Sequence, residues 1–159
     1  MQNRQRSFRQ LRLIAASGVA LAAGAASLGA TETSATGDIT VTITEMRNAK
    51  GVVRACMTTN PDIFPRCRKD PESHRLVVAA GEDMKLQFRN VKPGRYAIAL
   101  LHDENNNGKA DRALGMMPKE GFGFSRDAKV RMAPPKFKDA VFDYKGDDRS
   151  LTVKMRYML

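Results

Sequence analysis

The segment LHDENNNGKADRALG, residues 101–115, carries the side chains of this chain that are best suited to chemistry. It places Asp103, Asn105 and Asn107 at alternate positions, follows them with Gly108, and returns to a carboxylate at Asp111. Calcium takes about six to eight oxygen ligands, and its best-known protein loop supplies them from alternate residues around a glycine turn. The spacing therefore predicts a loop that wraps around a hard cation, with calcium as the cofactor that fits it.

The match to a calcium loop is incomplete at its last position, because Leu114 stands where a bidentate Glu is expected. A backbone carbonyl near Lys109 can add one ligand, and Glu120 or Asp127 can fold in to replace the missing carboxylate. The alternative is a metal-free turn, since Asn and Asp side chains bond their own backbone and collect in tight loops without an ion. The sequence leaves both interpretations open.

A third interpretation of this segment is catalytic. His102 adjoins Asp103, and a His beside a carboxylate can transfer protons. Glu104 and Glu120 can also be imagined as the opposed carboxylates of a glycosidase. Neighbours on a strand point to opposite faces, however, and the chain has no nucleophile elbow, zinc-protease motif or phosphate loop. We expect a protein that is not an enzyme, with a small hydrolase or carbohydrate-acting enzyme, its site along His102–Glu120, as the alternative.

The elements that must position this loop have the pattern of β-strands. Apolar and polar residues alternate in DITVTITEM, MKLQFRN and SLTVKMRYML, and GVVRACM follows the first of these after the turn-like RNAKG, which predicts a hairpin. The segment RYAIALLH is apolar on both faces, so we expect a central strand that ends at the loop. With RLVVAA and DAVFDYKG there are about seven short strands, which predicts an all-β sandwich or small barrel.

A long loop is expected between about residues 103 and 139, and its second half is dense in Gly, Pro and Phe. Loops of this length without structure of their own are uncommon in compact domains and are often functional. Phe122, Phe124 and Phe137 are expected to fold back onto the edge of the sandwich as a covering layer. The alternative is an aromatic platform for a ligand.

Residues 1–30 have the pattern of a cleaved secretory signal peptide. A basic stretch, MQNRQRSFRQLR, precedes the apolar run LIAASGVALAAGAASLGA, and small residues lie near its end. The alternative is a membrane anchor, but the run is short and only weakly hydrophobic for a span. We therefore expect a protein of the bacterial periplasm, or a secreted one, with no transmembrane segment after signal removal.

The remaining residues, 31–159, are enough for a single domain with one core. Loss of the signal lowers the net charge from +10 to +6, because it removes Arg4, Arg6, Arg9 and Arg12. The other charges alternate with apolar residues and form no block, which is typical of a solvated surface and not of a nucleic-acid-binding face. We expect no nucleic-acid partner and only a weak general attraction to anionic envelope surfaces; the sequence names no specific partner.

The two cysteines of the chain, Cys56 and Cys67, enclose the segment MTTNPDIFPR. In an oxidising, exported setting such a pair predicts a structural disulfide. A redox-active pair and a soft-metal site are the alternatives. The first usually has its cysteines two residues apart, and the second needs more Cys or His than this chain contains.

The chain from about Ile39 to Tyr157 also resembles a known family, and the most specific elements lie in its second half. PGRYAIALLHDENNNGKAD, PKEGFGFS and PPKFKDA are similar to sequences of the bacterial domain of unknown function 2141, a group of small exported proteins. The element PGRYAIAL is also similar to the turn-and-strand signature of prealbumin-like modules. This resemblance implies a seven-stranded Greek-key β-sandwich of the prealbumin (transthyretin-like) type. The expected function is that of an envelope-associated binding or structural module, since no activity is established for the family.

Overall fold

The computed structural model describes residues 35–113 and 117–159. The predicted signal peptide at residues 1–30 and the position of Leu114 lie outside these residues. From Ala35 onward the described residues belong to one compact unit.

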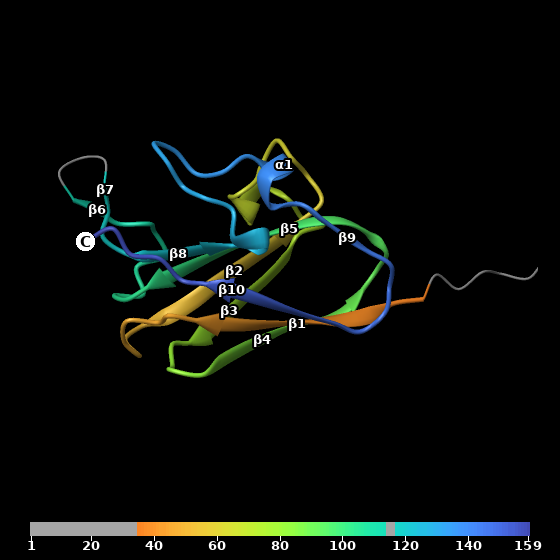
Figure 1. The fold of residues 1–159 in the computed structure, drawn as a ribbon, viewed down its shortest axis with the longest axis horizontal. Helices are drawn as coiled ribbons and strands as arrows, with labels where there is room; N and C mark the ends of the chain where they lie inside the picture. Colours follow the sequence, from red (N-terminus) through yellow and green to blue (C-terminus); the bar gives the residue numbers. More distant parts are fainter. Residues whose placement is uncertain (1–34, 114–116) are drawn as a thin grey trace, which may run out of the picture. The chain divides into compact units, whose positions relative to one another are not determined.

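The first sheet has three strands in the order β10 (Arg149–Lys154), β1 (Gly37–Thr44) and β4 (Met84–Val91). The central strand β1 pairs with β4 in antiparallel register and with β10 in parallel register, so the first and last long strands of the unit are neighbours. Figure 1 shows β10 and β1 lying side by side.

The second sheet has the order β3 (His74–Ala79), β2 (Val52–Thr58), β5 (Gly94–Asp103) and β8 (Gly121–Phe124), and β9 (Phe142–Tyr144) pairs with the start of β5. The predicted central strand is confirmed, because β5 has a partner on each side and is buried along most of its length. Two short strands, β6 (Arg112–Ala113) and β7 (Met117–Pro118), pair only with each other. Three short helices complete the described residues: η1 (Cys67–Lys69), η2 (Ser125–Asp127) and α1 (Phe137–Ala140).

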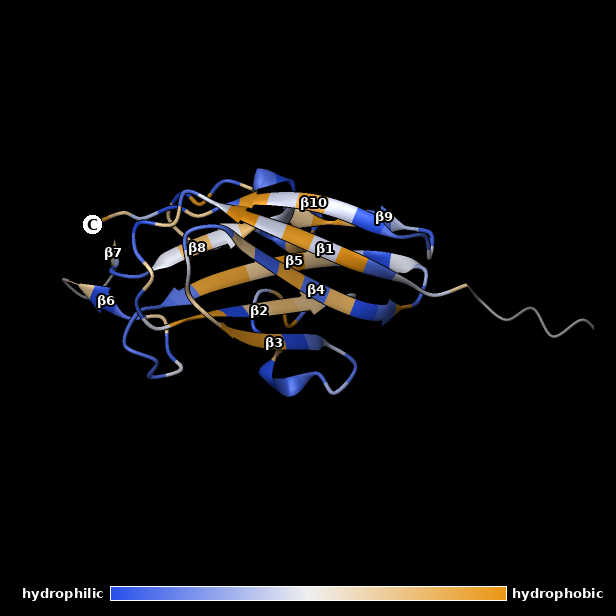
Figure 2. Ribbon diagram, turned by 90° about the horizontal axis from the view of Figure 1, so that it is seen from below, coloured by the Kyte–Doolittle hydropathy of each residue, from blue (hydrophilic) through white to orange (hydrophobic). Residues whose placement is uncertain are grey.

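The hydrophobic core lies between the two sheets. On β1 the alternate residues Ile39, Val41 and Ile43 are at most 1% exposed, and they belong to one cluster with residues of β2, β4, β5 and β10. Figure 2 shows the resulting alternation of hydrophobic and hydrophilic residues along β1. The expectation of an all-β fold with two faces packed on one core is therefore confirmed, because period-two alternation places every second side chain between the sheets.

Two sequence-based expectations about the strands were wrong. DITVTITEM and GVVRACM do not form a hairpin, because β1 pairs with β4 and β10 whereas β2 pairs with β3 and β5 in the other sheet. The predicted long loop also contains a strand of the main sheet, since β8 pairs with β5 from Ala99 to His102. β8 has the sequence GFGF, and a Cβ at Gly121 would lie 2.3 Å from the ring of Tyr157. Glycine is needed there for close packing, yet it weakens the strand signal in the sequence.

The outer face of the second sheet carries a smaller hydrophobic layer. Phe122 and Phe124 of β8 pack with Ala97 and Ala99 of β5 under Phe64, Ala128 and Ala140. The covering segments are the loop closed by Cys56 and Cys67 and the stretch from η2 to α1. Phe122 and Phe124 are thus buried as expected, but as residues of the sheet and not of a covering loop, whereas Phe137 is only half-buried.

Within residues 35–113 and 117–159, no helix has the length and apolar character needed to cross a membrane.

Candidate functional site

Asp103 is the best-defined residue of the predicted calcium loop. It is the last residue of β5, and its side chain is fully buried. Its Oδ1 accepts a hydrogen bond from the backbone N–H of Asn107 at 3.0 Å, and its Oδ2 accepts one from that of Gly108 at 2.8 Å. The carboxylate therefore caps the turn that follows it, as Asx side chains do in metal-free loops.

The positive charge that balances Asp103 is supplied by an arginine. Arg54, on the neighbouring strand β2, places its Nε 2.5 Å from Oδ2 of Asp103 and donates through Nη2 to Oδ1 of Asn106 at 2.7 Å. Arg68, in η1, donates to the backbone carbonyl of Gly108. A planar guanidinium offers several donors in fixed directions, so one Arg can hold two points of the loop at once. We call Arg54 and Arg68 the arginine clamp of the loop.

The two asparagines and Asp111 close the loop on themselves. The side-chain oxygens of Asn105 and Asn107 accept from backbone N–H groups two residues later, at Asn107 and Lys109 respectively. Their amide nitrogens donate to the carboxylate of Asp111 at 2.8–3.0 Å. The hydrogen bonds from Asn107 and then Asn105 lower the pKa of Asp111. The side-chain oxygens that Asp103, Asn105, Asn107 and Asp111 were predicted to offer to calcium therefore accept hydrogen bonds from within the loop.

Of the two proposed replacement carboxylates, the structure brings only Glu120 to the loop. Glu120 is 3% exposed and accepts the backbone N–H of Asp111 through Oε2 at 3.0 Å. Its Oε1 is buried and has no hydrogen-bond partner among the described residues. Burial raises the pKa of Glu120, and the charges of Asp103 and Asp111 raise it further. Asp127, in contrast, lies on η2 and forms an ion pair with Arg156 at 2.6 Å.

His102 is held inside the structure and not at a surface. It is 0% exposed, with Nδ1 2.8 Å from the hydroxyl of Tyr157 and Nε2 2.8 Å from the backbone carbonyl of Lys50. A carbonyl oxygen only accepts, so Nε2 carries a hydrogen and donates it there. Neither nitrogen is left for a substrate, and the geometry is that of a structural histidine.

Glu104, the residue after Asp103, forms an ion pair with another arginine, Arg47. Arg47 donates from Nε and Nη2 to the two carboxylate oxygens at 2.8 and 2.6 Å, and its guanidinium lies 4.5 Å from the ring centre of Tyr157. The hydrogen bond from Arg47 is the main reason that the pKa of Glu104 falls to about 2, and Asn48 contributes another bond. Arg47 also donates to the backbone carbonyls of Lys119 and Leu159. It thus joins the β1–β2 connection to Glu104, to the residue before Glu120, and to the C-terminal segment.

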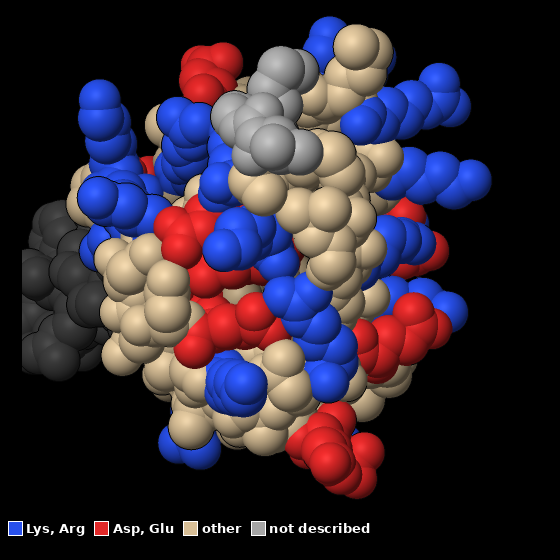
Figure 3. All heavy atoms as spheres, turned by 90° about the vertical axis from the view of Figure 1, so that its left-hand side faces the viewer, with Lys and Arg blue, Asp and Glu red and all other residues tan. Residues whose placement is uncertain are grey.

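Figure 3 looks onto the end of the molecule at which β6 and β7 lie, and it shows carboxylates gathered in the middle of the face with Lys and Arg around them. In the described part of the chain, no three His, Cys, Asp or Glu side chains are grouped so that they could hold a metal ion. The contacts match the metal-free interpretation of the loop, and the calcium site stays a prediction.

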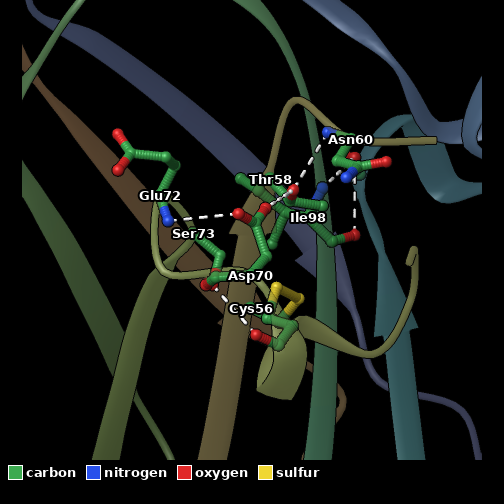
Figure 4. Close-up of a disulfide and its surroundings, with 9 residues drawn as sticks. Cys56, Thr58, Asn60, Asp70, Glu72, Ser73 and Ile98 are labelled. Carbon is green, nitrogen blue, oxygen red and sulfur yellow. Dashed lines mark hydrogen bonds between the residues drawn. A yellow bond between two sulfur atoms is a disulfide. The ribbon is translucent and has the colours of Figure 1, made fainter. Parts of the chain in front are cut away.

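The predicted pairing of Cys56 and Cys67 is confirmed. The two residues are bonded, with their Cα atoms 5.7 Å apart. Figure 4 shows the surrounding bonds: the hydroxyl of Thr58 donates to Asp70 at 2.8 Å, and the hydroxyl of Ser73 donates to the carbonyl of Cys67 at 3.1 Å. The disulfide and these bonds fix both ends of the segment between the cysteines, which we call the disulfide loop.

A surface groove lies between the disulfide loop and the segment that leads into α1. Its volume is about 600 Å³, and it is lined by residues 61–66 on one side and residues 134–138 on the other. Phe64 and Phe137 meet edge to face in it, with ring centres 6.0 Å apart. The groove was not predicted from the sequence, because its two walls are about seventy residues apart and only the alternative of an aromatic platform at Phe137 pointed toward it.

The arginine clamp was not predicted from the sequence either. A buried carboxylate at the end of an apolar strand needs a cation, so Asp103 itself is a signal for a nearby Arg or Lys. The identity of that cation depends on the pairing of β2 with β5, which aligns Arg54 with Leu101 and Val52 with Asp103. Period-two alternation does not reveal which strands pair.

Comparison with known proteins places the chain in one family. Residues 41–152 match the family described as an uncharacterized protein conserved in bacteria, domain of unknown function 2141. No curated protein matches the chain, and no solved structure matches it either. The family match covers both sheets, the loop at Asp103 and the groove, and well over half of the sequence. The chain therefore belongs to the bacterial family of domain of unknown function 2141.

Proposed function

We propose that this protein is an exported, non-enzymatic binding module of the bacterial envelope, built as a Greek-key sandwich of the prealbumin type. One observation carries the non-enzymatic role. A catalytic site along His102–Glu120 would use the histidine and the carboxylates of this segment, and His102, Asp103, Glu104 and Asp111 are all bonded to groups of the protein itself. Glu120 is only 3% exposed, so its unpartnered Oε1 does not face a substrate at the surface. An acid–base catalyst must reach the proton that it transfers, whereas the buried His102 uses both ring nitrogens in hydrogen bonds to Tyr157 and Lys50.

Two features support export. Residues 1–30 have the composition of a secretory signal. The bond between Cys56 and Cys67 persists in oxidising compartments and is rare where thiols are kept reduced. The groove beside this disulfide is the binding surface that we propose, because apolar and basic side chains line it together.

Export is tested with the full chain expressed in a bacterium and released by osmotic shock. We expect the protein in the periplasmic fraction, shortened at its N-terminus by mass spectrometry, and resistant to thiol alkylation until it is reduced. Full-length protein in the cytoplasmic fraction with two reactive thiols would refute the export part of the proposal.

Calcium is tested by thermal unfolding of the exported protein in millimolar calcium against chelator. We expect the same midpoint in both, because Arg54 already balances the charge of Asp103 and the loop oxygens have internal donors. Any ligand of the native state raises the midpoint by mass action. A rise with calcium that disappears in the variant Asp111→Asn would show instead that the loop rearranges around the ion.

A further inference from the structure

The floor of the groove is apolar and rigid. Pro61 and Pro65 of the disulfide loop line it together with Pro134 and Pro135, and the rings of Phe64 and Phe137 are in contact there. Phe64 is itself fixed from below, since its ring meets that of Phe124 of β8 at 6.0 Å. Proline fixes one backbone torsion and the disulfide holds the loop ends, so a ligand would bind with little ordering of the groove.

The rim of the groove is positively charged. Arg66, Lys136 and Lys138 line it and are exposed, against one acid, Asp62. Within residues 35–113 and 117–159, none of these three cations forms an ion pair. Their charge is therefore available to a partner, in contrast to that of Arg47 and Arg54.

We propose that this groove binds an acidic polypeptide segment, with an apolar or aromatic side chain seated between the prolines and phenylalanines and with carboxylates on the basic rim. The inference rests on the binding role proposed above and names the class of partner. Charge complementarity selects the acidic partner, and the apolar floor requires a side chain that a simple anion does not have.

The lining residues favour a peptide over a glycan or a bilayer. Sugar hydroxyls are recognised by polar groups at fixed positions, and the lining side chains include no hydroxyl or amide group. The surface of a bilayer is nearly flat, whereas Phe64 lies at the bottom of a hollow with only 9% of its surface exposed. A single peptide side chain can enter such a hollow.

The test uses a short blocked peptide with one Trp between glutamates, titrated against the exported, disulfide-bonded protein. The chain contains no Trp, so the fluorescence of the peptide reports its own burial. We expect saturable binding with a blue-shifted emission, and weaker binding by at least about tenfold when the glutamates are changed to glutamines. Amide NMR shifts should lie at residues 62–64, 66 and 136–138, since the prolines of the groove have no N–H.

Matched variants separate the groove from general charge effects. The double substitution Lys136→Glu with Lys138→Glu should weaken peptide binding by at least about tenfold. Lys85→Glu with Lys92→Glu changes the net charge equally on exposed residues outside the groove, and should weaken binding less than about twofold. Phe137→Leu keeps an apolar floor and tests the aromatic contact, with the thermal midpoint measured for every variant to confirm folding.

Two further probes distinguish failure of this inference from failure of the binding role. These probes are polygalacturonate, an acidic glycan, and vesicles of phosphatidylglycerol. If either one binds at the groove and the peptide does not, the binding role stands and the acidic-peptide assignment is wrong. If no probe shifts the groove resonances, both are wrong. Equal loss of peptide binding in the two double-lysine variants would show unspecific attraction and overturn the assignment.

Discussion

The loop end around Asp103 and the groove beside the disulfide differ in what their charged side chains contact. At the loop end, Arg47, Arg54 and Arg68 are all bonded to groups of the protein itself. At the groove, Arg66, Lys136 and Lys138 line an exposed apolar hollow, and no ion pair engages them among the described residues. The loop residues that resembled a calcium site in the sequence thus bond to the protein itself. The Pro- and Lys-containing segments, which carry no motif, form the exposed groove.

The largest expected effect is at the arginine clamp. Arg54→Met leaves the fully buried carboxylate of Asp103 without its counter-charge, so the free energy of unfolding should fall by about 3 kcal/mol. Urea denaturation measures this loss. Arg75→Met, an exposed residue on the neighbouring strand β3, is the control and should change stability by less than about 0.5 kcal/mol. A loss below 1 kcal/mol in Arg54→Met, on the order of a surface pair, would contradict the internal role of the clamp.

The second-largest effect is expected from loss of the disulfide, which should disturb the groove and not the loop at Asp103. Replacing Cys56 and Cys67 together by Ala should lower the free energy of unfolding by about 2 kcal/mol, because the unfolded chain is no longer constrained. Peptide affinity at the groove should fall with it. The amide hydrogens of Asn107 and Gly108, which bond to Asp103, should exchange as slowly relative to the other amides of the protein as they do with the disulfide intact. Faster relative exchange at those amides would mean that the two regions are not independent.

Glu120 is the exception at the loop end, since its buried Oε1 has no partner among the described residues. Its pKa is raised in the folded state, so the charged form costs stability at neutral pH, and the cost disappears as pH falls below the ordinary range of a Glu. Glu120→Gln should therefore stabilise the protein by about 1 kcal/mol at pH 7 and by almost nothing at pH 3. Exposed Glu72→Gln is the control. A destabilised Glu120→Gln at pH 7 would indicate that the carboxylate has a partner in solution.

The smallest effect is expected at Glu104, whose pKa is lowered to about 2. A carboxyl group whose pKa is lowered by folding stabilises the folded state at pH values above its ordinary pKa of 4.5. This contribution is lost as the pH falls from 4.5 toward 2. Arg47 and Glu104 are both partly exposed, so the pair contributes about 0.5 kcal/mol. Unfolding curves at pH 3 and pH 6 should show this difference in the natural protein and not in Glu104→Gln. If Glu104→Gln lost the same stability between pH 6 and pH 3 as the natural protein, another carboxylate would be responsible for the loss.

Much of the fold could be predicted because alternation reports burial residue by residue. Ile39, Val41 and Ile43 all proved to face the core, and β5 proved central because both of its faces are apolar. Pairing is different, since it depends on which edges meet. The expected hairpin between β1 and β2 failed for this reason, and the parallel pairing of β1 with β10 had no local signal.

The candidate site shows the same limit. The turn at Asp103 could be predicted from its Asx residues and Gly108, whose φ of +75° favours glycine. The cation at Asp103 could not, since Arg54 lies on a strand 49 residues earlier and only the sheet brings the two together. The groove was missed because neither wall has a motif of its own, and its shape arises only where the disulfide loop meets residues 134–138.

The pairing of β1 with β10 also determines when the domain can fold. β1 is synthesised before every other described strand and β10 after all of them, yet β1 lies in the middle of its sheet, between β10 and β4. Until the last strand emerges, one edge of β1 remains open and the sheet is incomplete. Contacts between the two ends of a chain form late and slow its folding. The three-stranded sheet can therefore be completed only when the last strand of the chain has been made.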